Sequence, residues 1–134
     1  MASMTSRYLG DLRTEDVHQL SGNTIITDAP PDNNGKGEAF SPTDLVCAAL
    51  NSCMMTLMGM LANREGIDLT GLSSEITKIM DASPRKIKEI RIVFSHPSLN
   101  ATEVQKEKLM RAAHTCPVAL SLSDTVKQTI TFNF

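Results

Sequence analysis

The stretch Ser41-Pro42-Thr43-Asp44 and the apolar run that follows it, from residue 45 to residue 61, decide how this chain folds. A serine N-cap, a proline at the first helical position and an acid in the first turn predict the start of a helix, which we expect to reach Asn63. The clearly polar side chains within the run are those of Asn51, Ser52, Cys53 and Thr56. A helix that is apolar on nearly every face has to be buried all round. In so small a chain we therefore expect a sheet and a second subunit to cover it.

A membrane span is the competing interpretation of the same run. Its length is at the lower limit for crossing a bilayer, and Asn51 lies near its middle, where an amide side chain is costly. We therefore expect a helix buried in protein and no membrane partner.

The remaining segments predict strands and two further helices around the central one. The signals are the alternation of apolar and polar residues along the strands, the turn-forming residues between them, and a capping box of Thr102 and Gln105. The expected elements are two or three strands in 7–27, a loop over 28–37, a hairpin of 72–80 with 87–94, helices over 102–114 and 117–124, and a final strand over 129–134. This order predicts an α+β fold with a mostly antiparallel sheet and one buried central helix.

Length and composition limit the possible functions. The 134 residues, 41% hydrophobic and 21% charged, fit one globular domain over residues 1–134. A net charge of −2 and a pI of about 5.9 argue against nucleic acid as a partner, because phosphate binding needs a concentrated basic patch. The first residues show no secretory pattern, so we expect a cytoplasmic protein whose thiols are kept reduced.

Three cysteines cannot all pair within one chain, so transient redox chemistry or simple burial fits them better than a disulfide scaffold. The Cys116-Pro117 pair places a thiol at a helix N-cap, where free backbone N–H groups stabilise a thiolate; a helix break that happens to contain cysteine is the equal alternative. Cys53 lies mid-helix, where cysteine usually serves as a small hydrophobe, but polar neighbours favour a further role. Cys47 lies about 120° away around the helix and is expected to pack.

Peroxide reduction by cysteine needs a thiolate, a cationic donor and a second thiol. Arg7 and Arg13, in the predicted strand region, are the candidate donors, and a solvated surface charge is the alternative for each. The histidines are scattered without zinc-ligand spacing to the cysteines, so we expect no metal and no other cofactor. His114 could touch the Cys116 thiol but better fits a surface position at a helix end.

Two motifs closely resemble those of the OsmC/Ohr family, the osmotically inducible and organic hydroperoxide resistance proteins. The first is Phe40-Ser41-Pro42-Thr43-Asp44-Leu45 followed by Ala48-Ala49-Leu50-x-Ser52-Cys53-Met54, and the second is Cys116-Pro117-Val118. Their order and spacing, and the layout of strands, helix, hairpin, helix and strand, match over essentially the whole chain.

The resemblance implies an OsmC-like fold, an intertwined homodimer and a cysteine-based peroxidase that reduces organic hydroperoxides. It implies that Cys53 attacks the peroxide, that Cys116 resolves the product to a disulfide, and that an external thiol or dithiol reduces the disulfide. It also implies a catalytic arginine from an N-terminal turn, for which Gly10-Asp11-Leu12-Arg13 is the matching segment.

One departure from the family pattern concerns the residue after the helix-start proline. Well-established peroxidases of the family have glutamate there, whereas this chain has Thr43, with the acid at Asp44. On a continuous helix Asp44 is about half a turn out of phase with Cys53. A redox-sensing or ligand-binding dimer with little peroxidase turnover is therefore the alternative function.

Overall fold

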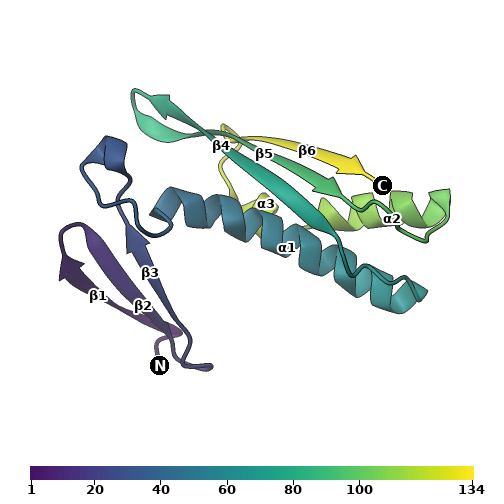
Figure 1. The fold of residues 1–134 in the computed structure, drawn as a ribbon, viewed down its shortest axis with the longest axis horizontal. Coiled ribbons are helices and arrows are strands. Elements are labelled where there is room, and N and C mark those ends of the chain that lie inside the picture. The colour runs from purple at the N-terminus through teal and green to yellow at the C-terminus, as the bar shows by residue number, and fades with distance from the viewer. The chain divides into compact units, whose positions relative to one another are not determined.

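The computed structural model describes all 134 residues, which form two compact units, residues 1–46 and 47–134 (Figure 1). The first unit contains β1 (Met4–Gly10), β2 (Arg13–His18), β3 (Thr24–Asp28), the short 3-10 helix η1 (Pro31–Asn33) and the first turn of α1 (Pro42–Glu65). The second contains the rest of α1, β4 (Ser73–Ala82), β5 (Arg85–Ser95), α2 (Glu103–Ala113), α3 (Pro117–Ser121) and β6 (Lys127–Asn133). That residues 1–134 form one domain stays a prediction.

The first unit is built on an antiparallel sheet of order β1-β2-β3. The turn between β1 and β2 contains Asp11 and Leu12, whose φ angles are 53° and 62°. This is a left-handed backbone conformation that residues other than glycine seldom adopt. The backbone of Leu12 is held on both sides, because its N–H donates to the Tyr8 hydroxyl at 3.2 Å and its carbonyl accepts from Ala29 N at 3.1 Å. The predicted short antiparallel strands are thus confirmed, and the turn fixes where β2 begins.

The second unit contains a sheet of order β4-β5-β6. The predicted hairpin is confirmed as β4 and β5, which pair antiparallel. β6 pairs with β5 in parallel, so this sheet is mixed; the other pairings of the two sheets are antiparallel, as the expected mostly antiparallel arrangement requires. The parallel pairing follows from the connection: α2 and α3 carry the chain back before β6 starts, as a crossover between parallel strands requires.

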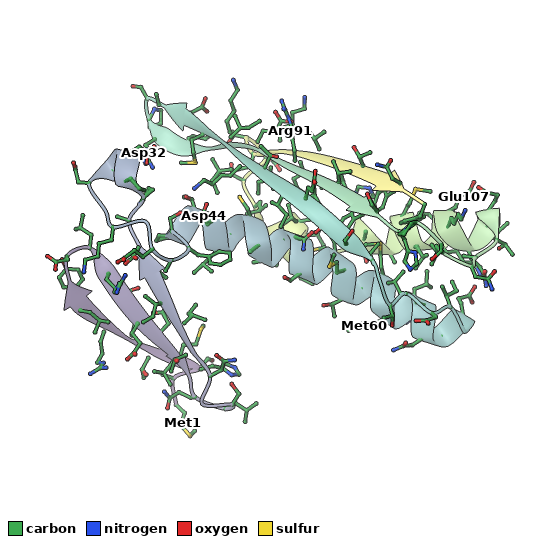
Figure 2. All side chains as sticks on the ribbon, viewed as in Figure 1. Met1, Asp32, Asp44, Met60, Arg91 and Glu107 are labelled. Carbon is green, nitrogen blue, oxygen red and sulfur yellow. The ribbon has the colours of Figure 1, made fainter.

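Helices cover one face of this second sheet (Figure 1). On β5, Ile90, Ile92 and Phe94 are fully buried, and they alternate with the more polar residues of the opposite face. The fully buried side chains that the helices contribute to this core include Leu50, Met54 and Met58 of α1 and Leu109 of α2. Arg91 projects from the other face (Figure 2). The α+β class is therefore confirmed, with the core between this sheet and the helices.

Helix α1 begins as the sequence predicted. The Ser41 hydroxyl accepts from Asp44 N at 3.1 Å, and the Asp44 carboxylate accepts from Ser41 N at 2.9 Å, so the two residues cap each other. Thr102 and Gln105 form the predicted capping box at the start of α2. Both helix starts were therefore correctly read from local sequence.

One chain alone does not bury α1 all round, and the second subunit that we expected to cover the remaining side stays a prediction. The exposed positions recur along one side of the helix and include Ala49, Ser52, Thr56 and Met60, of which Met60 is 52% exposed (Figure 2). By length and hydropathy α1 would also suffice to cross a membrane, a test that core helices of soluble proteins pass too. Its buried side packs into the core of the second unit, which is the role we expected.

Candidate active site: a pair of cysteines

The structure brings Cys53 and Cys116 together. Cys53 lies midway along α1 and is partly exposed, and Cys116 is the N-cap residue of α3 and is 0% exposed. Cys53 lies close enough to Cys116 to act on its thiol, and neither forms a disulfide. Two thiols from motifs far apart in the sequence thus meet at one place, with one sulfur nearer solvent than the other.

Backbone geometry at the start of α3 holds Cys116. Pro117 occupies the first helical position, and the Cys116 sulfur accepts a hydrogen bond from Ala119 N at 3.4 Å. Pro117 is well suited here because its fixed φ fits the first turn and its missing N–H would have had no partner. The N-cap position predicted for Cys116 is therefore confirmed.

The electrostatics of Cys116 differ from the expectation of a stabilised thiolate. Burial raises the pKa of this thiol, and the hydrogen bond with Cys53 raises it further. The backbone N–H groups of Ala119 and Val118 lower the pKa, but less strongly, so that the net direction is upward. The sequence showed the helix N-terminus but not the burial, which is the larger effect.

The helix around Cys53 carries small side chains. Ala49 and Thr56, one turn away on either side, are exposed, as is Ser52. The Thr56 hydroxyl donates to the Ser52 carbonyl at 2.8 Å, so it is satisfied within the helix. Small neighbours leave the Cys53 thiol open to a reactant in the single chain.

Asn51 and Cys47 point into the protein. The Asn51 amide nitrogen lies 3.8 Å from the Met55 sulfur, and its buried carbonyl oxygen has no hydrogen-bond partner. Cys47 is 3% exposed and forms no disulfide, in line with the packing role expected for it.

Arg13 lies in the first unit, within a cluster of its own. Its Nε and Nη2 donate to the two carboxylate oxygens of Asp28 at 2.7 and 2.8 Å, and Nη2 also donates to Glu38 at 3.0 Å. Asp28 is 0% exposed, and Arg13 holds the pKa of its carboxyl below the ordinary value. The same contact raises the pKa of Arg13, whose Nη1 stays outside this network.

Sequence reasoning missed Asp28 and Glu38 as partners of Arg13. Asp28 is the last residue of β3 and pairs across the sheet with Arg13, the first residue of β2. The sequence does place an acid at the end of a predicted strand. Identifying it as the partner of Arg13 requires the register between the two strands, which the sequence does not give.

Arg7 and His114, the remaining candidates from the sequence, are both exposed. Arg7 forms an ion pair with Glu15 at 2.7 Å on the sheet surface and is 73% exposed. His114 is the exposed C-cap of α2 and contacts the Phe132 ring edge-on at 5.9 Å, as expected for a helix-end residue. No group of three or more His, Cys, Asp or Glu side chains could hold a metal ion.

This fold and this cysteine pair define a protein of the OsmC-like class. The model of the OsmC-like protein family matches residues 35–131, which is most of the chain, so the chain belongs to that family. The resemblance noted in the sequence is thereby confirmed.

Solved structures agree with this assignment. A candidate osmotic stress induced and detoxification response protein from Psychrobacter arcticus is 42% identical, with a TM-score of 0.94 over 99% of this chain and 96% of that one. An organic hydroperoxide resistance protein OsmC from Legionella pneumophila is 19% identical, with a TM-score of 0.72 over 100% and 98% of the two chains. The organic hydroperoxide resistance protein OhrB of Bacillus subtilis is 18% identical, with a TM-score of 0.64 over 99% and 98%. No curated protein matches the chain.

Proposed function

We propose that this protein is a cytoplasmic thiol peroxidase that reduces organic hydroperoxides. The observation that carries the proposal is the neighbouring pair of Cys53, partly exposed, and Cys116, buried. Membership of the OsmC-like family supports a role in redox chemistry and peroxide resistance, which is the role named for the similar proteins of Legionella pneumophila and Bacillus subtilis.

The proposed reaction uses the two thiols in turn. The Cys53 thiolate attacks the terminal oxygen of the hydroperoxide, the O–O bond breaks, and the alkoxide leaves as an alcohol after taking a proton. The resulting Cys53 sulfenic acid is attacked by the Cys116 sulfur, so that an S–S bond forms and water leaves. An external thiol or dithiol then returns both cysteines to the reduced state and is itself oxidised to a disulfide.

Arg13 is the proposed cationic donor of the reaction. Arginine stays charged at every relevant pH and offers several donors, so it can stabilise a thiolate and polarise a peroxide. Asp28 and Glu38 occupy Nε and Nη2, which leaves the two hydrogens of Nη1 for such a contact. We therefore expect Arg13→Met to slow the reaction of Cys53 with a hydroperoxide more than Arg7→Met does.

We propose a homodimer as the working form. The exposed side of α1 lacks charged side chains through Met60, and the first unit exposes Met4, Tyr8, Leu9, Leu12 and Ile25. Exposed apolar side chains in such number are typical of a surface that a partner covers. A second copy would also cover the exposed side of a central helix that is apolar on nearly every face.

Intact mass and thiol counting test the peroxidase proposal. A small excess of an organic hydroperoxide should remove two hydrogens and two titratable thiols from the wild type, and Cys116→Ser should instead gain one oxygen. Consumption of peroxide with an added dithiol should then continue over many cycles and stop in Cys53→Ser. Unchanged mass with three titratable thiols would disprove the proposal.

The second candidate is a redox-sensing or ligand-binding dimer with little turnover. The residue after the helix-start proline is Thr43, and the Asp44 carboxylate is engaged in capping α1 through Ser41 N. An acid held in a helix cap is poorly placed to act as an acid–base group for a peroxide. A disulfide that forms once, without sustained consumption of peroxide in the presence of dithiol, would favour this candidate.

A further inference from the structure

The two sulfurs of the cysteine pair differ sharply in access. Cys116 is 0% exposed, while Cys53 on α1 is partly exposed. A disulfide between them would therefore present one accessible sulfur and one buried sulfur. Thiol–disulfide exchange depends on which sulfur the attacking thiolate can reach and on how well the other sulfur leaves.

We infer that the reductant attacks the disulfide at the Cys53 sulfur, and that Cys116 is the leaving group. This inference rests on the disulfide of the proposed function and names the route by which it is reduced. The attacking sulfur must approach the target sulfur from the side opposite to the leaving one. An attacking sulfur reaches the partly exposed Cys53 more readily than Cys116, which is 0% exposed.

Backbone donors face the Cys116 sulfur, but burial outweighs them and raises the pKa of this thiol, so access and not leaving-group acidity selects Cys53 as the point of attack. Ala119 N lies 3.4 Å from the Cys116 sulfur, and the N–H groups of Ala119 and Val118 act to lower the pKa of this thiol. They are fixed in place by α3, so they face the sulfur when it takes up negative charge. No backbone N–H is free to serve Cys53 in this way, because residues in the middle of a helix use theirs in the helix.

The exchange is balanced as follows. A reductant thiolate forms an S–S bond to Cys53, the Cys53–Cys116 bond breaks, and Cys116 leaves with the electron pair and takes a proton from water. A second reductant thiolate attacks the reductant sulfur of this mixed disulfide and releases Cys53. The protein gains two electrons and two protons, and two reductant thiols become one disulfide.

Trapping of the mixed disulfide tests the inference. The disulfide is made with diamide, which does not depend on peroxidase activity, and is then mixed with glutathione, quenched early with acid and N-ethylmaleimide, and mapped by peptide mass spectrometry. We expect glutathione on Cys53 and N-ethylmaleimide on Cys116. The Cys47→Ala variant is the matched control and should give the same pattern. Glutathione on Cys116 at the earliest time, or equal labelling of both, would overturn the inference.

A second measurement does not require the intramolecular disulfide. In a Cys47→Ala background, Cys116→Ser leaves Cys53 and Cys53→Ser leaves Cys116 as the one thiol. Native protein with Cys53 should react with 5,5′-dithiobis(2-nitrobenzoate) at least about tenfold faster than native protein with Cys116, because access controls the rate. Equal rates would contradict the inference. If diamide forms the disulfide and an organic hydroperoxide does not, the proposed function fails while trapping still decides the inference; if neither forms it, both fail.

Discussion

The carboxylate of Asp28 receives two parallel hydrogen bonds from the guanidinium of Arg13, at 2.7 and 2.8 Å, although no part of Asp28 is exposed. A third donor, Glu38 N, reaches the same carboxylate at 3.1 Å. The ion pair thus joins the start of β2, the end of β3 and the loop before α1. A two-point contact of this kind fixes orientation as well as charge.

We predict that Asp28→Asn lowers the thermal midpoint of unfolding more than Glu38→Gln does. The first change leaves a guanidinium beside a neutral amide in a buried place, whereas the second removes one contact of a carboxylate that is 65% exposed. Thermal unfolding followed by circular dichroism measures both variants against the wild type. Equal losses in the two variants would show that the ion pair does not hold this unit together.

The fold was largely predictable because its signals are local. The Ser41-Pro42 start of α1, the Thr102–Gln105 capping box and the hairpin turn near Pro84 each lie within a few residues, and the structure has all three elements. The parallel pairing of β6 with β5 depends on a long connection, and alternation alone does not give strand direction.

The candidate site was less predictable because burial and register decide its chemistry. Pairing of Cys53 with Cys116 was reached through resemblance, and the structure places the two thiols in contact. The pKa of Cys116 is raised by burial, which the sequence does not show. The partners of Arg13 depend on the register between β2 and β3. Helix-terminal signals predict which backbone N–H donors are present. They do not predict how far the site is buried from water.

Glu89 is predicted to make folding acid-sensitive. It is 7% exposed, and hydrogen bonds from Arg91 at 2.9 Å and Thr129 at 2.6 Å lower its pKa from 4.5 to about 2. A carboxyl whose pKa is lower in the folded state contributes stability above its unfolded pKa and loses it as the pH falls through the folded value. The contribution should therefore be complete above pH 4.5 and decline toward pH 2.

Urea unfolding at a series of pH values checks this prediction. The difference in the free energy of unfolding between the wild type and Glu89→Gln should be constant near neutral pH and shrink within that acid window. Because other carboxyls titrate in both proteins, the comparison isolates Glu89. A difference that stays constant down to pH 2 would rule out this role for the Arg91 and Thr129 contacts.

Leu50→Ala should destabilise the second unit by roughly 2–5 kcal/mol, because it removes a fully buried side chain of α1 and leaves a cavity in the core. Leu120→Ala is the matched control, since Leu120 is 78% exposed on α3, and it should change stability by less than about 0.5 kcal/mol. Chemical denaturation gives both values. A small effect at Leu50 would mean that the core rearranges to fill the space.

The exposed side of α1 should matter for assembly. We expect Met60→Glu to shift the proposed dimer toward monomer, because a charge would enter an apolar contact between copies. Val104→Glu changes an exposed apolar residue of α2 in the same way and serves as the control. Light scattering during size-exclusion chromatography reads the mass of each. A monomeric wild type, or a Met60→Glu protein that stays dimeric at low concentration, would argue against this face as the interface.

The Cys116 sulfur should also act as a helix cap. Two substitutions that both remove the thiol, but differ in capping ability, can test this role apart from the redox role. Serine is a good N-cap and can accept from Ala119 N, so Cys116→Ser should keep α3 folded; Cys116→Ala removes the acceptor and should loosen it. α3 has five residues and none is buried, so little else holds it except Gln128, which donates to the Ala119 carbonyl at 3.1 Å. Hydrogen exchange of residues 118–121 should therefore be faster in the alanine variant than in the serine variant. Equal exchange in the two would show that the sulfur contact does not stabilise α3.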